Sequence, residues 1–589
     1  MEGKSKEITV FDTYTGNKTP LKTETPGLVR WYSCGPTVYA DAHVGHARNY
    51  IVADTMRRIL ERHFRMTVVY AMNITDVDDK IIKGTRRKHL LQKYTDDAKA
   101  LSDAVYEEAF HLYAAGTGVF TAAELEETKA VLKNKTKAGA MLDQKQAKEA
   151  TAEKELLYRT LRKSLESEVA IRSQEDILQP YLEQLYSGEQ IPNEKFQDYA
   201  DGWRKEFFSD MESLGVKYPD ITPCVSRYIP QIVASIAQIV SNGFGYVSSG
   251  SVYFDSGAWT EKNTLKKIGS WQAGDPTEPG ADKKASSDFA LWKAAKKGEP
   301  AWASPWGQGR PGWHIECTGM ALDIFGETMD VHTGGIDLVF PHHNNEILQT
   351  EACLNTCKWA THFLHTGHVH IRGQKMSKSL KNFVTIKTAL EKYSAAALRV
   401  FFLRHSWNAP MSWVEEDVQA AEKLLRTFTN FLETASTHSK DPGQYAEPEK
   451  ELLSLLGETA AAVDGSFRDS FNTPAVLLRL GELVTASNSY LARAAQPNGL
   501  VTGKVSDYIG EVLSTLGVPL GDSNTKQDAL PFIRCSAVFR EKVRQLARAK
   551  QPHSQFFGEC DSLRSEFLKL GVSLEDAGTQ ESSIKFKRN

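Results

Sequence analysis

The chain has 589 residues and a formal net charge of −3, and 41% of its residues are hydrophobic while 25% are charged. A chain of this length is too long for one hydrophobic core, so roughly three or four domains are expected. The composition is that of an ordinary globular protein, no run of about 18 apolar residues predicts a membrane span, and the charge excludes a globally basic surface for nucleic acid.

Seven cysteines are scattered over the chain. An odd number at irregular spacing does not indicate a disulfide framework, so we expect a reducing compartment in which thiols are free to bind metal. The N-terminal MEGKSKEITV lacks the apolar stretch of a signal peptide. Together these features predict a cytoplasmic protein.

The first elements of the chain predict an α/β sheet. Residues 28–33 (LVRWYS) alternate in polarity and predict a strand that ends at a Cys-Gly-Pro turn. From about Val44 the apolar spacing becomes helical, and a second strand is predicted over residues 66–73. The order strand, helix, strand favours a parallel, doubly wound sheet.

The sequence HVGH lies where the first strand gives way to this helix. His43 and His46 are therefore expected at a helix N-terminus, where backbone N–H groups and the helix dipole attract phosphate. Gly45 between them lets a ligand approach the backbone closely. Two histidines at a turn are often only polar surface, so this motif gains its weight from the others that accompany it.

The composition changes in the middle of the chain. Residues 86–200 are rich in Lys, Glu, Ala and Gln and predict a solvated helical insertion without catalytic motifs. After it, YIPQIVASIAQIV predicts a helix, and GYVSSGSVYF predicts a hairpin of two short strands.

The stretch from Gly309 to Glu346 gathers residue types that bind metals. His342 and Glu346 are one helical turn apart and share a face, and sulfur with imidazole suits zinc in tetrahedral geometry. Cys353 and Cys357 share the same spacing, but small buried thiols on an amphipathic helix are the commoner case. The candidate ligands are Cys34, Cys317, His342, His343, Glu346, Cys353 and Cys357.

Lys375 and Lys378 flank Met-Ser in a polar stretch before a predicted helix. They could place positive charge on a triphosphate, although a solvated lysine run is an equally good interpretation of these residues alone. From about residue 416 apolar stripes predict a helix bundle. Near the end, Arg540, Arg544 and Arg548 share a helix face that is either solvated or binds a phosphate backbone, and the final SSIKFKRN is expected to be disordered.

HVGH followed by KMSKS resembles the paired signature of class I aminoacyl-tRNA synthetases. The segments CGPTVY, NITDVDDKII, SPWGQGRPGWHIECTGM and HTGGIDLVFPHHNNE resemble those of the cysteinyl-tRNA synthetase family. The resemblance implies a class I Rossmann-type doubly wound parallel sheet, a connective-peptide insertion and a C-terminal helical bundle. The implied parts are the two sheet halves (1–85 and 305–370), the charged insertion (86–200), the connective-peptide region (201–304), the KMSKS loop with the stem-contact region (371–415) and the helical anticodon-binding domain with its tail (416–589).

The same resemblance implies a set of site residues. One zinc per chain, facing the thiol of L-cysteine, is implied at Cys34, Cys317, His342 and Glu346. Catalytic residues that also bind ATP are implied at His43, His46, Lys375 and Lys378. Further ATP contacts are implied at Gly334, Gly335 and Asp337. The cysteine pocket is implied at Gly35, Thr75, Trp313 and His332.

The implied reaction is ATP-dependent activation of cysteine, with Mg²⁺ accompanying ATP, and transfer to the 3′ end of tRNA(Cys). A soft metal prefers a thiolate to the hydroxyl of serine, so no editing domain is needed. Three alternatives stay open: a cysteine-activating ligase with a small amine acceptor, a small-molecule nucleotidyltransferase, and a non-catalytic tRNA-binding protein. The sequence predicts no membrane partner and leaves monomer and homodimer open.

Overall fold

The computed structural model describes ten segments of the chain. Two compact units, Met1–Val518 and Pro519–Asn589, are each described by themselves. Most of the predicted insertion over 86–200, together with Cys357 and Lys378, lies outside the described residues. The described segments are 7–97, 174–262, 282–356, 358–371, 373–376, 382–438, 443–520, 523–569, 572–577 and 580–586.

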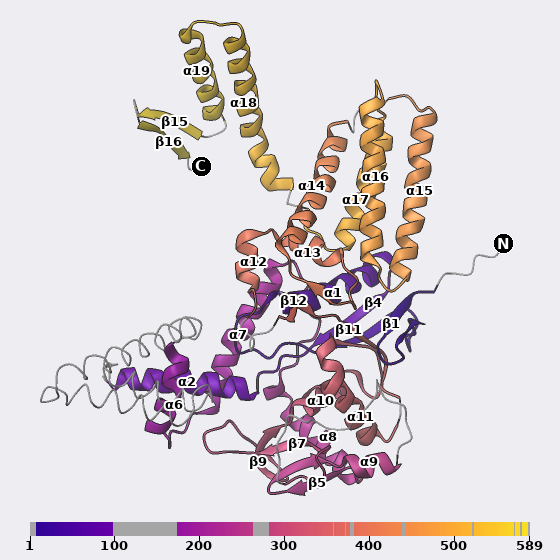
Figure 1. Cartoon of the computed structure of the whole chain (residues 1–589), viewed down its shortest axis with the longest axis vertical. Coiled ribbons are helices and arrows are strands. Elements are labelled where there is room, and N and C mark those ends of the chain that lie inside the picture. Colours follow the sequence, from indigo (N-terminus) through magenta and orange to yellow (C-terminus); the bar gives the residue numbers. More distant parts are fainter. Residues whose placement is uncertain are drawn as a thin grey trace, which may run out of the picture. The chain divides into compact units, whose positions relative to one another are not determined.

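A four-stranded sheet organises the first unit (Figure 1). Its order is β11-β10-β3-β4, and every neighbouring pair is parallel. Both predicted strands and the helix between them are therefore confirmed, as is the parallel sheet. The elements are β3 (Leu28–Ser33), α1 (Val44–Arg58) with its continuation η1 (Ile59–His63), β4 (Thr67–Met72), β10 (Met329–Gly335) and β11 (Ala360–Thr366).

A second, five-stranded sheet lies between the two halves of the first in sequence. Its order is β5-β6-β7-β9-β8, its pairs are antiparallel, and β5 and β6 form the predicted hairpin. One hydrophobic core joins the two sheets through helices, because Tyr32, Ile232, Trp292 and Ile315 belong to the same buried cluster. The elements are α8 (Ile229–Ser241), β5 (Gly245–Ser248), β6 (Ser251–Phe254), β7 (Phe289–Ala294), β8 (Trp302–Ser304), β9 (Gly307–Pro311), α10 (Trp313–Phe325) and α11 (Asn344–Leu354).

A small three-stranded sheet follows β11. In it β12 pairs with β13 in antiparallel and with β14 in parallel orientation. The elements are β12 (Val369–Ile371), β13 (Gln374–Lys375), α12 (Ile386–Lys392), α13 (Ala395–Leu403) and β14 (Met411–Ser412). The remaining described elements before this sheet are β1 (Thr9–Asp12), β2 (Asn17–Pro20), α2 (Asp79–Asp96), α6 (Gln174–Leu185), α7 (Asn193–Ser213), η2 (Val225–Arg227), α9 (Ser256–Lys262), η3 (Ile336–Leu338) and η4 (Val339–His343).

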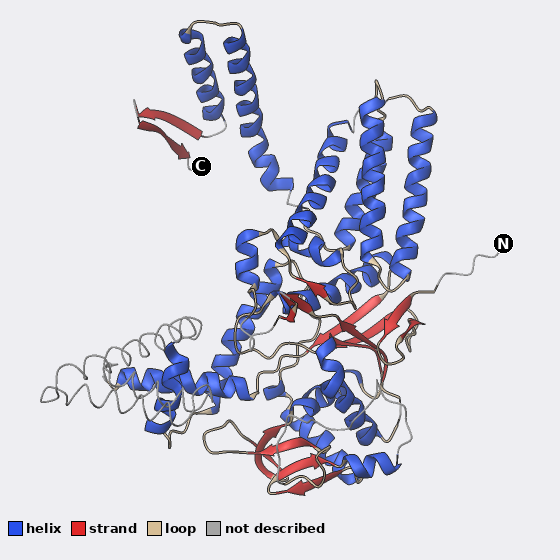
Figure 2. Cartoon of the chain, viewed as in Figure 1, coloured by secondary structure: helices blue, strands red, loops and turns tan. Residues whose placement is uncertain are grey.

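The first unit ends in a bundle of helices (Figure 2). Phe428 and Phe431, on the apolar stripe predicted from the sequence, are fully buried there. Among the described helices none is long and apolar enough to cross a membrane. The helices are α14 (Glu415–His438), α15 (Glu447–Arg468), α16 (Thr473–Arg493) and α17 (Gly499–Thr515).

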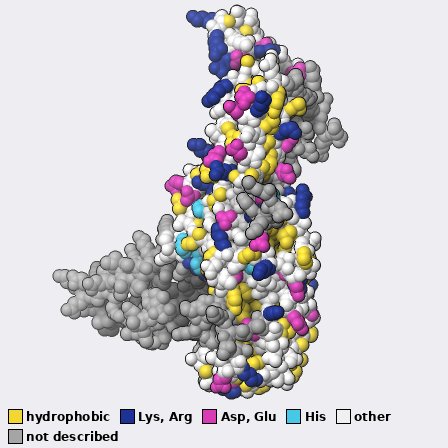
Figure 3. Space-filling model, turned by 90° about the vertical axis from the view of Figure 1, so that its right-hand side faces the viewer, with side chains coloured by type: hydrophobic (Ala, Val, Ile, Leu, Met, Phe, Trp, Pro, Cys, Tyr) yellow, Lys and Arg dark blue, Asp and Glu magenta, His cyan; other side chains and the backbone are white. Residues whose placement is uncertain are grey.

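The second unit contains two helices and a hairpin, α18 (Ser523–Arg548), α19 (His553–Lys569), β15 (Val572–Ala577) and β16 (Gln580–Phe586). The expectation of a disordered terminus was wrong for residues 582–586, because β16 pairs with β15 in antiparallel register, and residues 587–589 lie outside the described residues. Backbone pairing supplies the order that the polar composition did not predict. On the face of the molecule in Figure 3, acidic and basic side chains are interspersed.

Candidate active site

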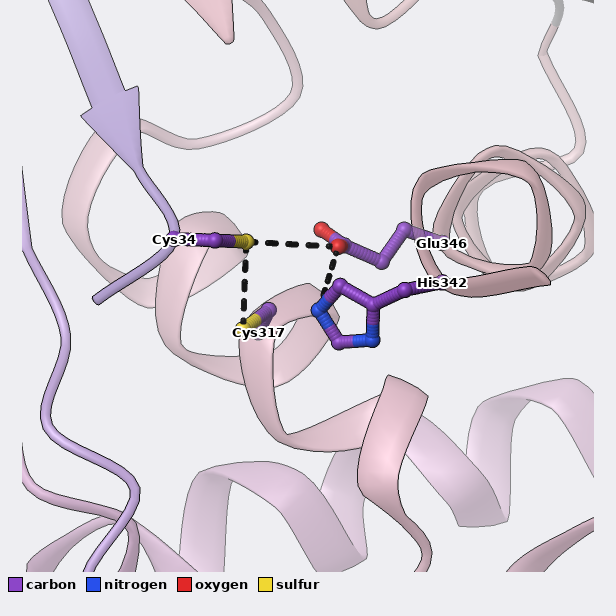
Figure 4. A group of neighbouring side chains, drawn as sticks. All are labelled: Cys34, Cys317, His342 and Glu346. Atoms are coloured by element: carbon purple, nitrogen blue, oxygen red, sulfur yellow. Dashed lines mark hydrogen bonds and ion pairs between the residues drawn. The ribbon is translucent and has the colours of Figure 1, made fainter. Parts of the chain in front are cut away.

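Four side chains from three separate parts of the chain converge beside the carboxyl end of β3 (Figure 4). Cys34 directly follows β3, Cys317 lies on α10, and His342 and Glu346 lie at η4 and α11. We call these four residues the donor group. One ligand atom from each lies within 4.8 Å of the other three, and none of the residues is more than 3% exposed. This arrangement can hold a metal ion.

The contacts within the donor group are short. The Cys34 Sγ donates to the Cys317 Sγ at 3.7 Å and lies 3.6 Å from Glu346 Oε1. His342 Nε2 lies 2.9 Å from the same carboxylate oxygen. Two thiols, an imidazole and a carboxylate thus point at one small volume, and all four can bind one cation through their deprotonated forms.

Burial and mutual charge set the ionisation of the donor group. The hydrogen bond from Cys34 lowers the pKa of Cys317 to about 6, whereas burial raises the pKa of Cys34. Burial opposes ionisation of Glu346, but the charges of His332 and His342 lower its pKa to about 2. Burial also opposes protonation of His342, but Glu346 and Cys317 raise its pKa to about 10. Cys317 and Glu346 are therefore the ionised acids of the group, and Cys34 and His342 each release a proton when all four side chains bind one cation.

Further imidazoles surround the donor group. His343 Nε2 lies 3.3 Å from Cys34 Sγ, and its Nδ1 lies 2.8 Å from His365 Nε2. Burial lowers the pKa of His365 to about 3 and that of His343 well below the usual range, so both rings are neutral at pH 7. A second possible set of ligands, Cys34, His332, His343 and Glu346, shares two members with the donor group.

Two of these neighbours were not predicted. His365 contacts His343, and His314 Nδ1 lies 3.0 Å from His342 Nδ1. The histidine-rich sequence HFLHTGHVH was the available indication for His365. The candidate ligand Cys353 is buried but belongs to neither group of possible ligands among the described residues.

The two histidines of HVGH lie at the start of α1. His43 is the N-cap, its ring accepts from the backbone N–H of His46, and the two rings stack with centroids 3.7 Å apart. The segment after the KMSKS sequence lies against them, since Val44 N donates to Val384 O at 2.9 Å and Ile386 N donates to Ala42 O at 3.0 Å. Backbone hydrogen bonds therefore join the start of α1 to the segment that follows KMSKS.

Lys375 lies on β13 and pairs with Asp337, with Nζ 3.3 Å from Oδ2. Both side chains are partly exposed, Lys375 by 41% and Asp337 by 49%. We call His43, His46 and Lys375 the signature group. Lys378, the other predicted lysine, lies outside the described residues.

Two of the predicted pocket residues meet through a residue that was not predicted. The side chain of Asn73 accepts from the backbone N–H of Gly35 at 2.9 Å and donates to Thr75 Oγ1 at 3.3 Å. A Cβ on Gly35 would lie 1.6 Å from the Asn73 carbonyl oxygen, so only glycine fits there.

The other predicted pocket residues adjoin the donor group. Trp313 stacks on His342 with ring centroids 4.7 Å apart, and His332 Nε2 lies 2.9 Å from Glu346 Oε2.

Two of the predicted ATP contacts, Gly334 and Gly335, lie where the backbone is close to other side chains. A Cβ on Gly334 would lie 2.9 Å from the His343 ring, and one on Gly335 would lie 2.5 Å from Asp337 Oδ1. Backbone at these two glycines therefore approaches both the imidazoles and the carboxylate paired with Lys375.

Residues 20–423 match the family described as the catalytic domain of class I (C) tRNA synthetases. A cytoplasmic cysteine–tRNA ligase of Gallus gallus is 37% identical in a match that covers 97% of this chain and 81% of the relative. One of Drosophila melanogaster is 36% identical over 98% of this chain and 83% of its own. In fold, the chain is similar to a methionyl-tRNA synthetase of Mycobacterium tuberculosis in complex with methionyl-adenylate, with a TM-score of 0.51 at 13% identity, over 86% of this chain and 94% of that one.

Proposed function

Because this chain belongs to the class I tRNA synthetases, and within them to the cysteine–tRNA ligases, we propose that it activates L-cysteine with ATP and transfers the cysteinyl group to the 3′ end of tRNA(Cys). The observation that carries this proposal is the buried donor group, because a site built from two thiols, an imidazole and a carboxylate suits recognition of a thiol substrate through a metal. The relatives named cytoplasmic place the activity in the cytoplasm.

We propose zinc as the ion of the donor group. In a tetrahedral zinc site two sulfur ligands, each about 2.3 Å from the metal, lie about 3.8 Å apart. The Sγ atoms of Cys34 and Cys317 are 3.7 Å apart. A zinc ion held there would act as a borderline-soft Lewis acid that prefers the thiolate of cysteine to the hydroxyl of serine.

The residues around the donor group form the proposed binding site for the amino acid. Trp313 stacks on His342 and is 40% exposed, so its ring offers an aromatic surface beside the donor group. The neutral rings of His343 and His365 add no positive charge that would repel the metal. Asn73 holds Gly35 through its backbone N–H and Thr75 through its hydroxyl oxygen, which leaves the hydroxyl proton of Thr75 for a polar atom of the amino acid.

The signature group supports the activation step. The cysteine carboxylate attacks the α-phosphate of ATP, the bond from the α-phosphate to pyrophosphate breaks, and pyrophosphate leaves. Negative charge that develops on the phosphates is stabilised by His43 and His46 at the N-terminus of α1, by Lys375 and Lys378, and by the Mg²⁺ that accompanies ATP. In this proposal Gly334, Gly335 and Asp337 hold the adenosine.

The other parts of the chain carry the tRNA step. The region 371–415 holds the KMSKS loop and contacts the acceptor stem, and the helices from residue 416 onward recognise the anticodon. The cysteinyl group then passes from the adenylate to the terminal ribose, and AMP leaves.

The test is ATP–pyrophosphate exchange with cysteine, with serine as the matched substrate and with a chelator in one arm. Exchange with cysteine, little exchange with serine, and loss of exchange on metal removal that zinc restores are the expected results. A folded, zinc-loaded chain that neither exchanges nor charges tRNA(Cys) would overturn the proposal in favour of a non-catalytic protein.

A further inference from the structure

Arg48 is a buried arginine on α1, close behind HVGH, and only 1% of it is exposed. Its guanidinium donates to backbone carbonyls from two segments of the chain, and no carboxylate pairs with it among the described residues. The acceptors are Gly367 O at 2.7 Å, His368 O at 2.9 Å, Ser406 O at 3.0 Å, Trp407 O at 3.5 Å and Ala409 O at 2.6 Å.

A buried charge without a counter-ion is costly, so it calls for a structural reason. Burial lowers the pKa of Arg48 to about 10, and the side chain therefore stays charged at neutral pH. The other fully buried arginine near α1, Arg399, pairs with the carboxylate of Asp54 at 2.6 Å. The two terminal nitrogens of Arg48 instead donate to main-chain carbonyls, which fixes the course of the backbone at those points.

The two bonded segments support the strand pair that carries Lys375. Residues 367–368 lead into β12, which pairs with β13 so that His370 is opposite Lys375. Residues 406–409 lead into β14, which pairs with β12 on its other edge. The segments approach so closely that a Cβ on Gly367 would lie 2.2 Å from the Ala409 carbonyl oxygen. Arg48 lies where they meet and binds both to α1.

The far end of the KMSKS stretch is also attached to the start of α1. Val384 O accepts from Val44 N, and Ile386 N donates to Ala42 O. The described residues on both sides of the KMSKS sequence are thus hydrogen-bonded to α1 or to the residues just before it. At the end that leads into KMSKS, the Arg48 side chain supplies hydrogen bonds between α1 and residues 367–368.

We propose that Arg48 is a positioning residue for the activation step, which holds the base of the Lys375 strand at a fixed place relative to His43 and His46. This inference rests on the proposed function, because it concerns the alignment of the signature group on one triphosphate. A displacement of about 1 Å in such groups lowers a rate about 100-fold. Lysine cannot replace Arg48, because an ammonium lacks the planar fork that reaches two segments at once.

The test compares Arg48→Lys and Arg48→Met with Arg399→Lys and Arg399→Met, in the full chain loaded with zinc. The Arg399 variants are matched controls, because that arginine is equally buried but contacts neither segment. For each variant, kcat of cysteine-dependent exchange, the KM values for ATP and cysteine, and the midpoint of thermal unfolding are measured.

We expect Arg48→Lys to lower kcat about 100-fold while the KM for cysteine changes less than about twofold. The Arg399 variants lose thermal stability but keep kcat within about threefold of the wild type. Arg48→Lys keeps the test decisive if Arg48→Met fails to fold. An unchanged kcat in Arg48→Lys, or an equal loss of kcat in an Arg399 variant of the same unfolding midpoint, would overturn the inference. A wild-type chain without exchange would instead overturn the proposed function itself.

Discussion

The donor group and the signature group differ in how far they are removed from water. No residue of the donor group is more than 3% exposed, whereas the Lys375 side chain is 41% exposed. In the donor group burial and close charges move pKa values far from their usual range. In the signature group His43, at the N-cap of α1, is only 7% exposed, whereas Lys375 and its partner Asp337 are open to solvent.

This difference matches two chemical tasks. Discrimination between the sulfur of cysteine and the oxygen of serine needs metal ligands that are fixed and shielded from water. Water would compete for the metal and weaken every charge interaction. A triphosphate is large and highly charged, and it enters and leaves at each turnover. Cationic side chains that remain partly hydrated are therefore better suited to bind it. The comparison predicts that changes in the donor group act on specificity and metal content, and that changes in the signature group act on rate.

The largest effect is expected from Cys317→Ser. A serine hydroxyl does not supply the thiolate that holds the ion, so bound zinc falls from one per chain to near zero and cysteine-dependent exchange falls by more than about 100-fold. Metal analysis and exchange rates measure the two losses together. Cys353→Ser, at a buried thiol outside the donor group, is the control and keeps both. Retained zinc in Cys317→Ser would show that the ligand assignment is wrong.

A second large effect is expected from Lys375→Ala and from Lys378→Ala. Loss of one charge that stabilises the transition state lowers kcat of exchange about 100-fold, while the KM for cysteine changes little. Steady-state exchange over a range of ATP and cysteine concentrations measures both. Lys392→Ala on α12 is the matched control, because among the described residues this lysine pairs only with Glu415, at 3.2 Å. If the KM for cysteine rose and kcat did not fall, the assignment of rate to the signature group and specificity to the donor group would be wrong.

A smaller effect is expected from Trp313→Ala. The ring stacks on His342, and loss of such a contact, worth about 0.5–1.5 kcal/mol, weakens cysteine binding up to about 10-fold while zinc stays bound. Calorimetric titration of the zinc-loaded variant with cysteine measures the affinity, and Tyr218→Ala serves as an exposed aromatic control. Loss of zinc in Trp313→Ala would assign this ring to metal retention instead of substrate binding.

The smallest effect on activity, and a clear effect on stability, is expected from Asp54→Asn. Burial opposes ionisation of Asp54, but the charges of Arg399 and Arg58 hold its pKa below the usual value. Breaking this buried pair costs about 3–5 kcal/mol in the free energy of unfolding at pH 7, because Arg399 keeps an uncompensated charge.

The pH dependence of that loss follows from the lowered pKa of Asp54. The stabilisation is fully present above the unfolded pKa of about 4 and disappears as the pH falls through the lower folded pKa. The difference between wild type and Asp54→Asn, measured by denaturant unfolding, therefore shrinks below about pH 4. Asp220→Asn, at a more exposed carboxylate, costs less than about 1 kcal/mol at any pH. A constant difference down to pH 2 would mean that Asp54 is not ionised in the folded protein.

The sequence by itself determined the local elements and the residue types of the site. Alternation over 28–33 and helical spacing after Val44 predicted β3 and α1, because side-chain periodicity reports which face of an element is buried. The chemistry of thiols and imidazoles marked Cys317 and His342 as candidate ligands, but it marked His343, Cys353 and Cys357 equally.

Only the tertiary structure decided which of these residues meet. Cys34 and Cys317 are 283 positions apart in the chain, and periodicity carries no information on contacts of that range. The same holds for Asn73 beneath the pocket, His365 behind His343, and Arg48, which in the sequence is one more polar residue of an amphipathic helix. Their roles come from packing and from the shared need of buried polar atoms for partners, and these are properties of the folded chain as a whole.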